Sequence, residues 1–460
     1  MIEHIPEDIL KLNRTFQDAG FEIYLVGGCV RNMLLQKEAK DWDFTTNATP
    51  EEILKIFPDG FYDNVFGTVG IPLKSENGEV TKVFEVTTYR TEEGYTNRRH
   101  PEKVTWGKSV QEDLSRRDFT MNAIALKIVG EKNNLKTEIV DPYNGQKDIK
   151  DKIVRAVGDP QERFKEDALR LMRAIRFATQ LSFSIEEKTL GAIKEDAQLL
   201  TEIAQERIRD EFMKILGSDY PYEGIMLLKN TGLLEHILPE LLEGIGVSQA
   251  RPGRHHTTDV FTHNVFSLKF CPSTDPLVRF ATLIHDVAKP YVLGKDEEGY
   301  VIFHNHEIVG AKMAGVICDR LRFSKKEKEK VTKLIRWHMF TVDEHITDSA
   351  VRRFIRRIGV ENVQDMMDLR IGDRLGGGTQ TAESWRLKLF KKRVEEQLAP
   401  LPFSINDLAI DGNDIMKELT IKPSKKIGEI LQKLFEEVDE DLTKNTKEYL
   451  LERIKQPDLT

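Results

Sequence analysis

Cysteines and long apolar runs are both scarce in this chain of 460 residues. The three cysteines, Cys29, Cys271 and Cys318, lie far apart and are odd in number, which argues against a disulfide framework and against a cysteine zinc site. No apolar run approaches the roughly 18 residues that a membrane helix needs. The N-terminal stretch MIEHIPEDIL has neither the basic nor the long apolar region of a signal peptide. These absences predict a cytoplasmic protein with no membrane partner.

Internal repeats, low-complexity segments and a strong excess of one charge are also lacking. The formal net charge is -8, with 40% hydrophobic and 31% charged residues. This balance argues against a protein that coats nucleic acid along its whole surface, but it is compatible with local basic faces that contact phosphates. A chain of this length can form two to four domains with real cores.

The residue pattern changes character along the chain. Between about residues 21 and 155, short β-rich runs such as FEIYLVGG, TVGIPLKS, TKVFEVTTY and AIALKIVG are separated by turns, which predicts a mixed sheet with flanking helices. From about residue 160 onward, apolar residues recur at helical spacing, as in DALRLMRAIRFATQL. The expected fold class is therefore α+β, with a mixed-sheet N-terminal part followed by an all-α region.

Two aspartates one residue apart, Asp41 and Asp43, follow the apolar run of residues 24–26. On a strand, residues i and i+2 point to the same face, so the pattern predicts two neighbouring carboxylates at a strand's edge. Magnesium would compensate their repulsion, because it binds carboxylate oxygens together with substrate phosphates, and two ions can assist an in-line displacement. A solvated turn is the alternative for an isolated pair of this kind. The strand and the glycines that precede this pair favour the metal site.

Gly27 and Gly28 fit the same hypothesis, because residues without side chains let backbone N–H groups approach a triphosphate. A helix starting near Val30 would aim its positive end and Arg31 at that anion. Glu85 lies in the apolar run VFEVTTY. It is either a third carboxylate beside the metal or a residue on the solvated face of a strand.

Several motifs in the first 220 residues resemble the class II tRNA nucleotidyltransferases, that is, the CCA-adding enzymes and their poly(A) polymerase relatives within the polymerase-β-like superfamily. The resemblance rests on YLVGGCVRNMLL with KDWDFTTNATPEEI, on the loop FEVTTYRTEEGYTNRRHPEKVTW, and on SRRDFTMNAIA, DPYNG and FKEDALRLMRAIRFA, in this order. It implies a nucleotidyltransferase head followed by a helical neck, body and tail. It also implies that Asp41 and Asp43 hold Mg²⁺ and that Arg117 binds the ribose and triphosphate.

The motif FKEDALRLMRAIRFA resembles the base-reading helix of that family. Asp167 and Arg170 are three residues apart, so they would be neighbours on a helix, and an exposed ion pair is the simplest interpretation. Cytosine and adenine, however, both present an amino donor beside a ring-nitrogen acceptor, so one carboxylate and one guanidinium can select both without a template. By resemblance, Arg173 and Arg176 help to hold the nucleotide and its phosphates.

Two departures from the family pattern bear on specificity. In the loop, Asn97 and His100 stand where relatives usually carry an acidic residue and an arginine. The loop nevertheless has full length, which by resemblance favours an enzyme that adds the terminal A. The second departure is Asn32, which follows Arg31 where relatives mostly have Asp, so the neighbour expected to orient this arginine is neutral.

A second set of polar residues lies in the helical half. Imidazole and carboxylate groups suit divalent transition metals, and their order here resembles an HD phosphohydrolase domain, which some bacterial CCA-adding enzymes carry. By resemblance, four residues bind one divalent metal, either a transition metal or Mg²⁺, and two others assist with a second ion or with the scissile phosphate. The four expected ligands are His263, His285, Asp286 and Asp373, and the two accessory residues are His306 and His338.

The resemblance divides the chain into a head (1–155), a neck and body (156–247), an HD domain (248–376) and a tRNA-binding tail (377–460). The run VRRFIRRIG predicts a basic helix stripe of Arg352, Arg353, Arg356 and Arg357, suited to phosphates or simply solvated. The expected partners are the 3′ end of tRNA, CTP and ATP, and no obligate protein partner is evident.

The sequence therefore predicts a template-independent, magnesium-dependent nucleotidyltransferase that adds C and A to the 3′ end of tRNA. One alternative on the same scaffold is an enzyme that adds only A, or a poly(A) polymerase. An alternative of another class is an HD phosphodiesterase whose degenerate head only binds RNA.

Overall fold

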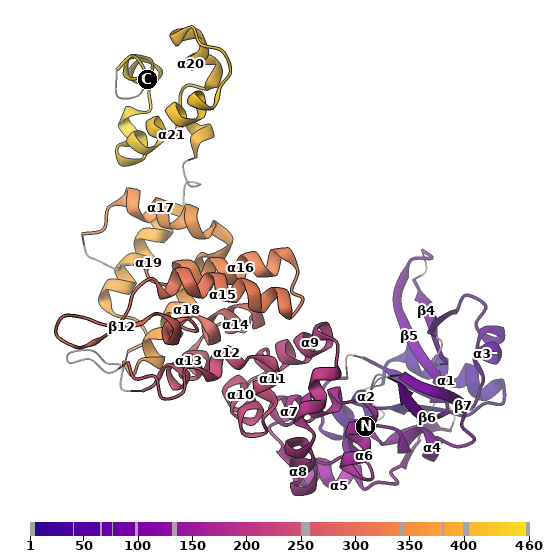
Figure 1. Cartoon of the computed structure of the whole chain (residues 1–460). Helices are drawn as coiled ribbons and strands as arrows, with labels where there is room; N and C mark the ends of the chain where they lie inside the picture. Colours follow the sequence, from indigo (N-terminus) through magenta and orange to yellow (C-terminus); the bar gives the residue numbers. More distant parts are fainter. Residues whose placement is uncertain are drawn as a thin grey trace. The chain divides into compact units, whose positions relative to one another are not determined.

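The computed structural model (Figure 1) divides into two compact units, residues 1–243 with 317–323, and residues 244–316 with 324–460. Within the described part of the chain, no helix is long and apolar enough to cross a membrane. The division into four domains stays a prediction. The structure describes residues 5–39, 41–64, 67–75, 77–96, 100–130, 136–249, 258–340, 345–379, 381–398 and 404–456.

A mixed seven-stranded sheet forms the N-terminal part of the first unit, in the order β3-β4-β5-β2-β1-β8-β9. All its pairings are antiparallel except that of β2 with β5. The expected mixed sheet is confirmed, and the β-rich runs at 21–28, 68–75, 81–89 and 123–130 each contain a strand of it. The strands are β1 (Ile23–Val26), β2 (Asp43–Thr46), β3 (Phe61–Asn64), β4 (Thr68–Lys74), β5 (Val80–Thr88), β8 (Ala125–Val129) and β9 (Lys136–Val140).

Burial explains why these segments form strands. All four residues of the central strand β1 are buried, as expected for a continuous apolar run inside a sheet. Near the C-terminal end of β5, buried Phe84 and Val86 flank exposed Glu85, so one face packs on the core and the other is open. The flanking helices are α1 (Glu7–Asp18), α2 (Gly28–Leu34), α3 (Pro50–Ile56), α4 (Val110–Ser115) and α5 (Gly145–Asp151).

The segment predicted as a loop, FEVTTYRTEEGYTNRRHPEKVTW, contains two strands, β6 (Arg90–Thr96) and β7 (His100–Trp106), which pair with each other in an antiparallel ribbon. Asn97 lies outside the described residues, and the side chain of His100 is not described. The proposed consequence of these two departures for specificity therefore stays a prediction.

Helices occupy the rest of the first unit, as the helical spacing predicted. The expected base-reading helix is interrupted, because α6 ends at Glu166 and α7 begins at Leu169, with Asp167 in an extended conformation between them. A short parallel bridge joins β10 (Ile153–Val154) to β11 (Ser184–Ile185). The helices are α6 (Pro160–Glu166), α7 (Leu169–Leu181), α8 (Glu187–Glu195), α9 (Gln205–Leu216), α10 (Pro221–Asn230), α11 (Leu233–Ile237) and α12 (Pro239–Leu242).

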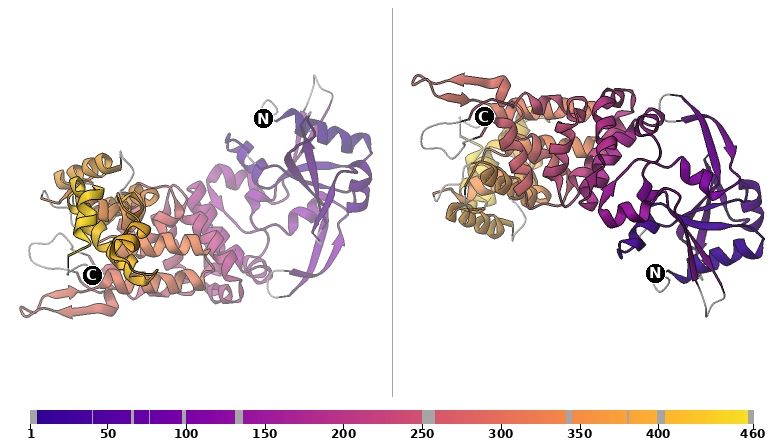
Figure 2. Two further views of the ribbon diagram at one scale, coloured as in Figure 1. Left: turned by 90° about the horizontal axis from the view of Figure 1, so that it is seen from above. Right: turned by 90° about the horizontal axis from the view of Figure 1, so that it is seen from below.

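The described residues of the second unit are helical apart from loops and one hairpin, in which β12 (Leu293–Lys295) pairs with β13 (Val301–Phe303). Figure 2 shows this hairpin as a narrow ribbon that projects beside the helices. The α+β class is confirmed, and the structure adds these short strands to the helical half. The helices around the second polar cluster are α13 (Val260–Phe270), α14 (Pro276–Ile284), α15 (His306–Arg320), α16 (Lys325–Trp337), α17 (Asp348–Ile358), α18 (Val363–Gly376) and α19 (Trp385–Leu398).

The C-terminal helices α20 (Gly412–Leu419), α21 (Lys425–Glu440) and α22 (Lys447–Arg453) have an apolar cluster of their own, which includes Ile415, Leu434 and Leu450. Asp411 caps the start of α20, since its carboxylate accepts hydrogen bonds from the N–H groups of Asn413 and Asp414. The helix therefore starts at the Asp411–Gly412 turn.

Candidate active site and metal centre

Two carboxylates stand side by side on the head sheet. Asp43 is the first residue of β2, and it is the register partner of Val26 on β1 and of Glu85 on β5. Since paired residues of neighbouring strands point to the same face, the Asp43 and Glu85 side chains are neighbours. Asp41 was expected on the same strand, but it lies in the bend before β2, next to buried Trp42.

The environment of Asp43 is tuned by burial and by two charges. The residue as a whole is exposed, yet the protein around the carboxyl group displaces enough water to raise its pKa above the usual value. The charge of Arg117 opposes this shift, and the charge of Asp41 adds to it. A carboxylate in this environment is stabilised by a nearby cation.

Gly27 brings the groups of the site close to the backbone. Its φ of +73° favours glycine. A Cβ atom at this position would lie 3.2 Å from Nη1 of Arg117 and 3.5 Å from Oδ2 of Asp43. The chain enters α2 here, so the helix begins two residues earlier than the predicted start near Val30. A Cβ on Gly28 would meet Nη2 of Arg31 at 3.7 Å.

Asn32 orients Arg31 despite its lack of charge. Its amide oxygen accepts hydrogen bonds from Nε and Nη2 of Arg31, at 3.3 and 2.9 Å. Nη1 of Arg31 donates to Oδ1 of Asn122 at 2.8 Å. The expected loss of an orienting neighbour is therefore made good by an amide, which supplies the acceptor without the charge.

Three guanidinium groups gather around the ring of Phe177, those of Arg31, Arg173 and Arg176, at 5.2, 5.4 and 4.2 Å from its centre. Desolvation lowers the pKa of Arg31 to about 10, and the charges of Arg176 and Arg173 contribute. Asp118 offsets part of this positive charge, with its Oδ2 at 2.7 Å from Nε of Arg173. Such a cluster of like charges is suited to binding a polyanion.

Asp118 remains ionised despite its burial. Burial raises its pKa, but the charges of Arg173 and Arg170 outweigh that effect, and the pKa lies at about 2. Arg117 is held by Asp113, whose Oδ2 accepts a hydrogen bond from its Nη2 at 3.1 Å. These buried carboxylates fix the arginines that line the site.

Asp167 and Arg170 do not form the ion pair that their spacing suggested. Asp167 accepts two hydrogen bonds from Arg207 of α9, at 3.3 and 2.8 Å. Arg170 donates to a carboxylate oxygen of Glu166 at 2.5 Å and to the carbonyl oxygens of Arg163 and Arg116, each at 3.0 Å. The break between α6 and α7 separates the two side chains and gives each its own partners.

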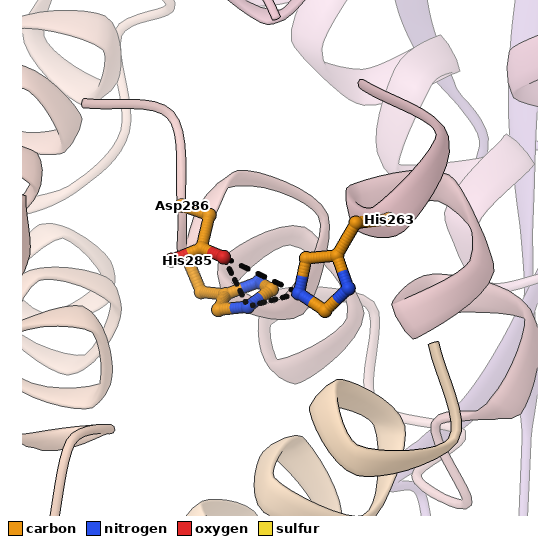
Figure 3. A group of neighbouring side chains, drawn as sticks. All are labelled: His263, His285 and Asp286. Carbon is orange, nitrogen blue, oxygen red and sulfur yellow. Dashed lines mark hydrogen bonds and ion pairs between the residues drawn. The ribbon is translucent and has the colours of Figure 1, made fainter. Parts of the chain in front are cut away.

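The second cluster brings four predicted ligands together. Nε2 of His263 lies 3.2 Å from Nε2 of His285, 3.2 Å from Oδ2 of Asp286 and 3.3 Å from Oδ1 of Asp373. Nε2 of His285 lies 3.3 and 3.6 Å from the same two carboxylate oxygens. Figure 3 shows the ring of His263 facing His285 and Asp286.

A second group, formed by Asp286, His306 and His338, shares Asp286 with the first. Oδ1 of Asp286 lies 3.3 Å from Nε2 of His306 and 3.7 Å from Nε2 of His338, and the two ring nitrogens are 3.3 Å apart. Asp286 therefore directs Oδ2 to His263 and His285, and Oδ1 to His306 and His338. Its Oδ1 is buried and has no hydrogen-bond partner among the described residues.

These residues fit a metal ion. A tetrahedral ion with bonds of about 2.0 Å sets its ligand atoms about 3.3 Å apart, close to the separations of 3.2 to 3.6 Å in the first group. The Nδ1 atoms of His285, His306 and His338 each contact a backbone carbonyl oxygen at 2.7 to 2.8 Å. That contact makes Nδ1 the donor and leaves Nε2 as the ligand atom.

Comparison with known proteins places these sites in context. Three family models match: the poly A polymerase head domain at residues 23–155, a probable RNA and SrmB-binding site of polymerase A at 182–244, and a putative tRNA nucleotidyltransferase domain 2 at 295–454. The CCA-adding enzyme of Ligilactobacillus salivarius is 31% identical over 99% of this chain and 98% of its own length. The chain belongs to the CCA-adding enzyme family.

Other relatives of this CCA-adding family match over shorter segments. The CCA-adding enzyme of Lactobacillus helveticus is 42% identical over 51% of this chain, and the chain spans 57% of that relative's length. The crystal structure of the Bacillus stearothermophilus CCA-adding enzyme in complex with CTP has a TM-score of 0.69 and 25% identity, and covers 98% of this chain and 97% of its own. Nucleotidyl transfer in this family generally depends on divalent metal ions.

A fold match extends to a tRNA complex of the CCA-adding enzyme from Thermotoga maritima. That structure has a TM-score of 0.60 and 19% identity, and covers 99% of this chain and 96% of its own. This likeness concerns the fold alone.

Only two of the four arginines in the predicted basic stripe of α17 are exposed. Arg352 is buried, and its Nε pairs with Oδ1 of Asp439 at 2.8 Å, while Nη2 of Arg356 lies 2.6 Å from Oδ2 of the same residue. These two arginines therefore face α21 rather than solvent. Arg353 and Arg357 are exposed, and Arg357 lies over the ring of Trp337 at 4.7 Å.

Sequence reasoning missed several polar residues at both sites. Arg207, which binds Asp167, follows it by 40 positions, so local spacing offers no signal. The pairing of Asp113 with Arg117 has helical i, i+4 spacing and was detectable in principle. Lys289 follows the His285–Asp286 pair by a single turn and lies 2.5 Å from Oδ2 of Asp286.

Proposed function

We propose that this chain adds C and A nucleotides from CTP and ATP to the 3′ end of tRNA without a template. The observation that carries the proposal is the close approach of Asp43 and Arg117 to Gly27, with Glu85 as the register neighbour of Asp43. A pair of carboxylates next to fixed guanidinium groups is the arrangement that a metal-bound triphosphate requires. A tRNA substrate implies that the protein works in the cytoplasm.

Asp41, Asp43 and Glu85 would hold Mg²⁺. The raised pKa of Asp43 supports this role, because a bound cation would stabilise its charged form. When bound, Mg²⁺ supplies Lewis-acid stabilisation of the charge on the attacking and leaving oxygens. The glycines Gly27 and Gly28 admit the triphosphate to the backbone at the start of α2. Arg117, Arg31, Arg173 and Arg176 bind its phosphates. The 3′-hydroxyl oxygen of the tRNA attacks the α-phosphorus, its proton is released, and pyrophosphate leaves.

Asp167 and Arg170 would select the base. Cytosine and adenine offer Asp167 an amino donor and Arg170 a ring-nitrogen acceptor, whereas uracil and guanine would leave both groups without matching partners. Asp167 accepts two bonds from Arg207 and one from the N–H of Leu169. A carboxylate has about four acceptor positions, and a guanidinium has five N–H groups. Both residues can therefore contact a base while their present partners hold them.

The test is an addition assay with tRNA that ends in no C, one C or CC, supplied with CTP and ATP separately. We expect incorporation of C, C and A in that order, and no incorporation after Asp43→Ala. Incorporation of A alone would identify an A-only enzyme, and long A tails would identify a poly(A) polymerase. The comparisons favour neither alternative, because the matching relatives are named CCA-adding enzymes.

A second activity is favoured by the buried histidine–aspartate cluster. His263, His285, Asp286 and Asp373 would hold a divalent ion, either a transition metal or Mg²⁺, and His306 and His338 would assist with a second ion or a phosphate. When bound, such an ion supplies an activated water for phosphate-ester hydrolysis. Release of nitrophenol from bis(4-nitrophenyl) phosphate, with the nitrophenyl monoester as the other product, tests this role: it should be lost in His285→Ala and retained in Asp43→Ala. The reverse pattern would contradict it.

A further inference from the structure

A pocket with a volume of about 400 Å³ lies between α18 and the start of α19, and neither proposed reaction uses it. This volume falls within the roughly 300 to 1,000 Å³ that small-molecule sites occupy. Its walls include Phe340, Arg370, Arg374, Trp385 and Arg386. Three arginines and two aromatic rings around one cavity suggest a ligand site rather than a simple solvent-exposed surface.

The pocket carries positive charge that is only partly offset. Nη1 of Arg370 donates to Oδ2 of Asp373 at 2.8 Å. Within the described part of the chain, neither Arg374 nor Arg386 forms an ion pair with a carboxylate, and the buried Nε of Arg374 has no hydrogen-bond partner. Since both arginines line the pocket, an anion there would offset their charge.

The start of α19 adds to this field. Ser384 and the first residues of the helix line the pocket, and Oγ of Ser384 accepts a hydrogen bond from the N–H of Leu387 at 3.2 Å. The helix is 14 residues long, so its N-terminal partial charge is fully developed. The dipole and the arginines therefore favour the same kind of ligand, a compact anion such as a phosphate group.

The aromatic walls offer a place for a flat ring. Trp385 is 58% exposed, and the guanidinium of Arg386 lies 5.3 Å from the centre of its ring. Elsewhere in the lining, the guanidinium of Arg370 lies 5.6 Å from the ring centre of Phe340. Exposed indole and guanidinium planes are the surfaces on which nucleobases stack.

We propose that this pocket binds a nucleoside monophosphate, with its phosphate on Arg374 and Arg386 and its base against Trp385. None of its lining residues belongs to the proposed nucleotide site of the head, and binding here does not depend on either proposed reaction. Arg370 links it to Asp373, so the ligand would lie one side chain away from the buried histidine cluster. A free nucleoside monophosphate and the 3′-terminal nucleotide of an RNA both present a base and a phosphate group, which is a monoester in the free nucleotide and a singly charged diester in the RNA.

The test uses the full chain labelled with 5-fluorotryptophan. Because the chain contains four tryptophans, it gives four ¹⁹F signals. Trp385→Phe identifies the signal of Trp385. We expect 5′-AMP to shift this signal in a saturable way, with weaker binding of adenosine and of inorganic phosphate. A tRNA lacking its terminal A, added as a competitor, distinguishes a free nucleotide from an RNA end.

Arg374→Gln should weaken AMP binding about tenfold, because it removes a charge-assisted contact. Arg386→Gln is a second variant at an exposed position, and it should weaken binding in the same direction if Arg374→Gln fails to fold. Arg353→Gln, at an exposed position of α17, is the matched control and should leave the affinity unchanged. The proposal is overturned if the Trp385 signal does not respond, if phosphate alone binds as tightly as AMP, or if both pocket variants bind AMP normally.

Discussion

Arg207 holds both carboxylate oxygens of Asp167, with its Nη1 3.3 Å from Oδ1 and its Nη2 2.8 Å from Oδ2. The carboxylate proposed to read the base is therefore fixed by a side chain from a separate helix. This contact explains how Asp167 keeps a defined orientation at the break between α6 and α7.

Removal of that support should relax base selection. In Arg207→Ala we expect Asp167 to lose its orientation, so that misincorporation of U and G rises and the kcat/KM for CTP and ATP falls about tenfold to a hundredfold. Arg207→Lys should restore part of the selectivity. The measurement is single-turnover incorporation with each of the four triphosphates, with Lys194→Ala on neighbouring α8 as the control. An unchanged ratio of correct to incorrect bases would show that Arg207 has no positioning role.

Asp43 and Glu85 provide a direct test of the metal site. Asp43→Ala should abolish nucleotide addition. Glu85→Gln should reduce it about tenfold or more and raise the Mg²⁺ concentration required for half-maximal rate, because a ligand beside Asp43 has lost its charge. Glu79→Gln, an exposed residue just before β5, is the matched control. Rates measured across a Mg²⁺ titration would contradict a role for Glu85 if its variant behaved as the control does.

The low pKa of Asp118 predicts a stability effect in acid. Its folded-state pKa of about 2 lies below the ordinary value of 3.8 for an aspartate, so this carboxylate stabilises the fold above pH 3.8 and loses that contribution as the pH falls towards 2. The shift corresponds to about 2 kcal/mol at neutral pH. Asp118→Asn should cost about this much at pH 7, and the difference from wild type should shrink between pH 4 and 2.

Urea unfolding of both proteins at several pH values measures this difference. Asp151→Asn, an exposed position in the same unit, should show no such pH-dependent gap. A gap for Asp118→Asn that stayed constant down to pH 2 would mean that its charge does not stabilise the fold.

The histidine–aspartate cluster should couple metal binding to stability. Mn²⁺ or Ni²⁺ at a hundred times its dissociation constant would stabilise the folded chain by about 2.7 kcal/mol. We expect thermal unfolding to shift upward with the metal and to return after chelation. His285→Ala should remove the response, whereas His304→Ala, at an exposed position nearby, should keep it. A metal response that survives His285→Ala would place the ion elsewhere.

Substitutions on the two faces of α17 should have different effects on stability. Arg352→Ala breaks a buried pair with Asp439, so we expect it to destabilise the protein by about 3 kcal/mol or more. Arg353→Ala should leave stability within about 0.5 kcal/mol, and any loss of tRNA affinity from it should come with a weaker dependence on salt. Urea unfolding and tRNA binding at several salt concentrations measure both effects. Equal stabilities of the two variants would contradict this division.

The strands of the head sheet were predictable, because continuous or alternating apolar residues carry a local signal, as in the four buried residues of β1. The grouping of His263, His285, Asp286 and Asp373 was expected from residue order and resemblance, and the structure brings their ligand atoms together. The roles assigned to these residues, and those of the head, remain predictions.

Partners that depend on tertiary contacts were not predictable. No Gly or Pro marks the break at Asp167 and Ala168, so a continuous helix was the expected interpretation, and the Arg207 contact could not be anticipated. On α17, the buried Val351, Phe354, Ile355 and Ile358 define the inner face. That periodicity places Arg352 near the inner face, but the acidic partner at Asp439, 87 positions away, carries no local signal.

The arginines around Phe177 have a consequence for the end of each catalytic cycle. Under the proposed role of Arg31, Arg173 and Arg176 in binding the triphosphate, a polyphosphate relieves their mutual repulsion. Departing pyrophosphate would then be retained by the same groups that admit the next substrate. We expect successive additions to slow as pyrophosphate accumulates, and added pyrophosphatase to restore the pace of the later steps.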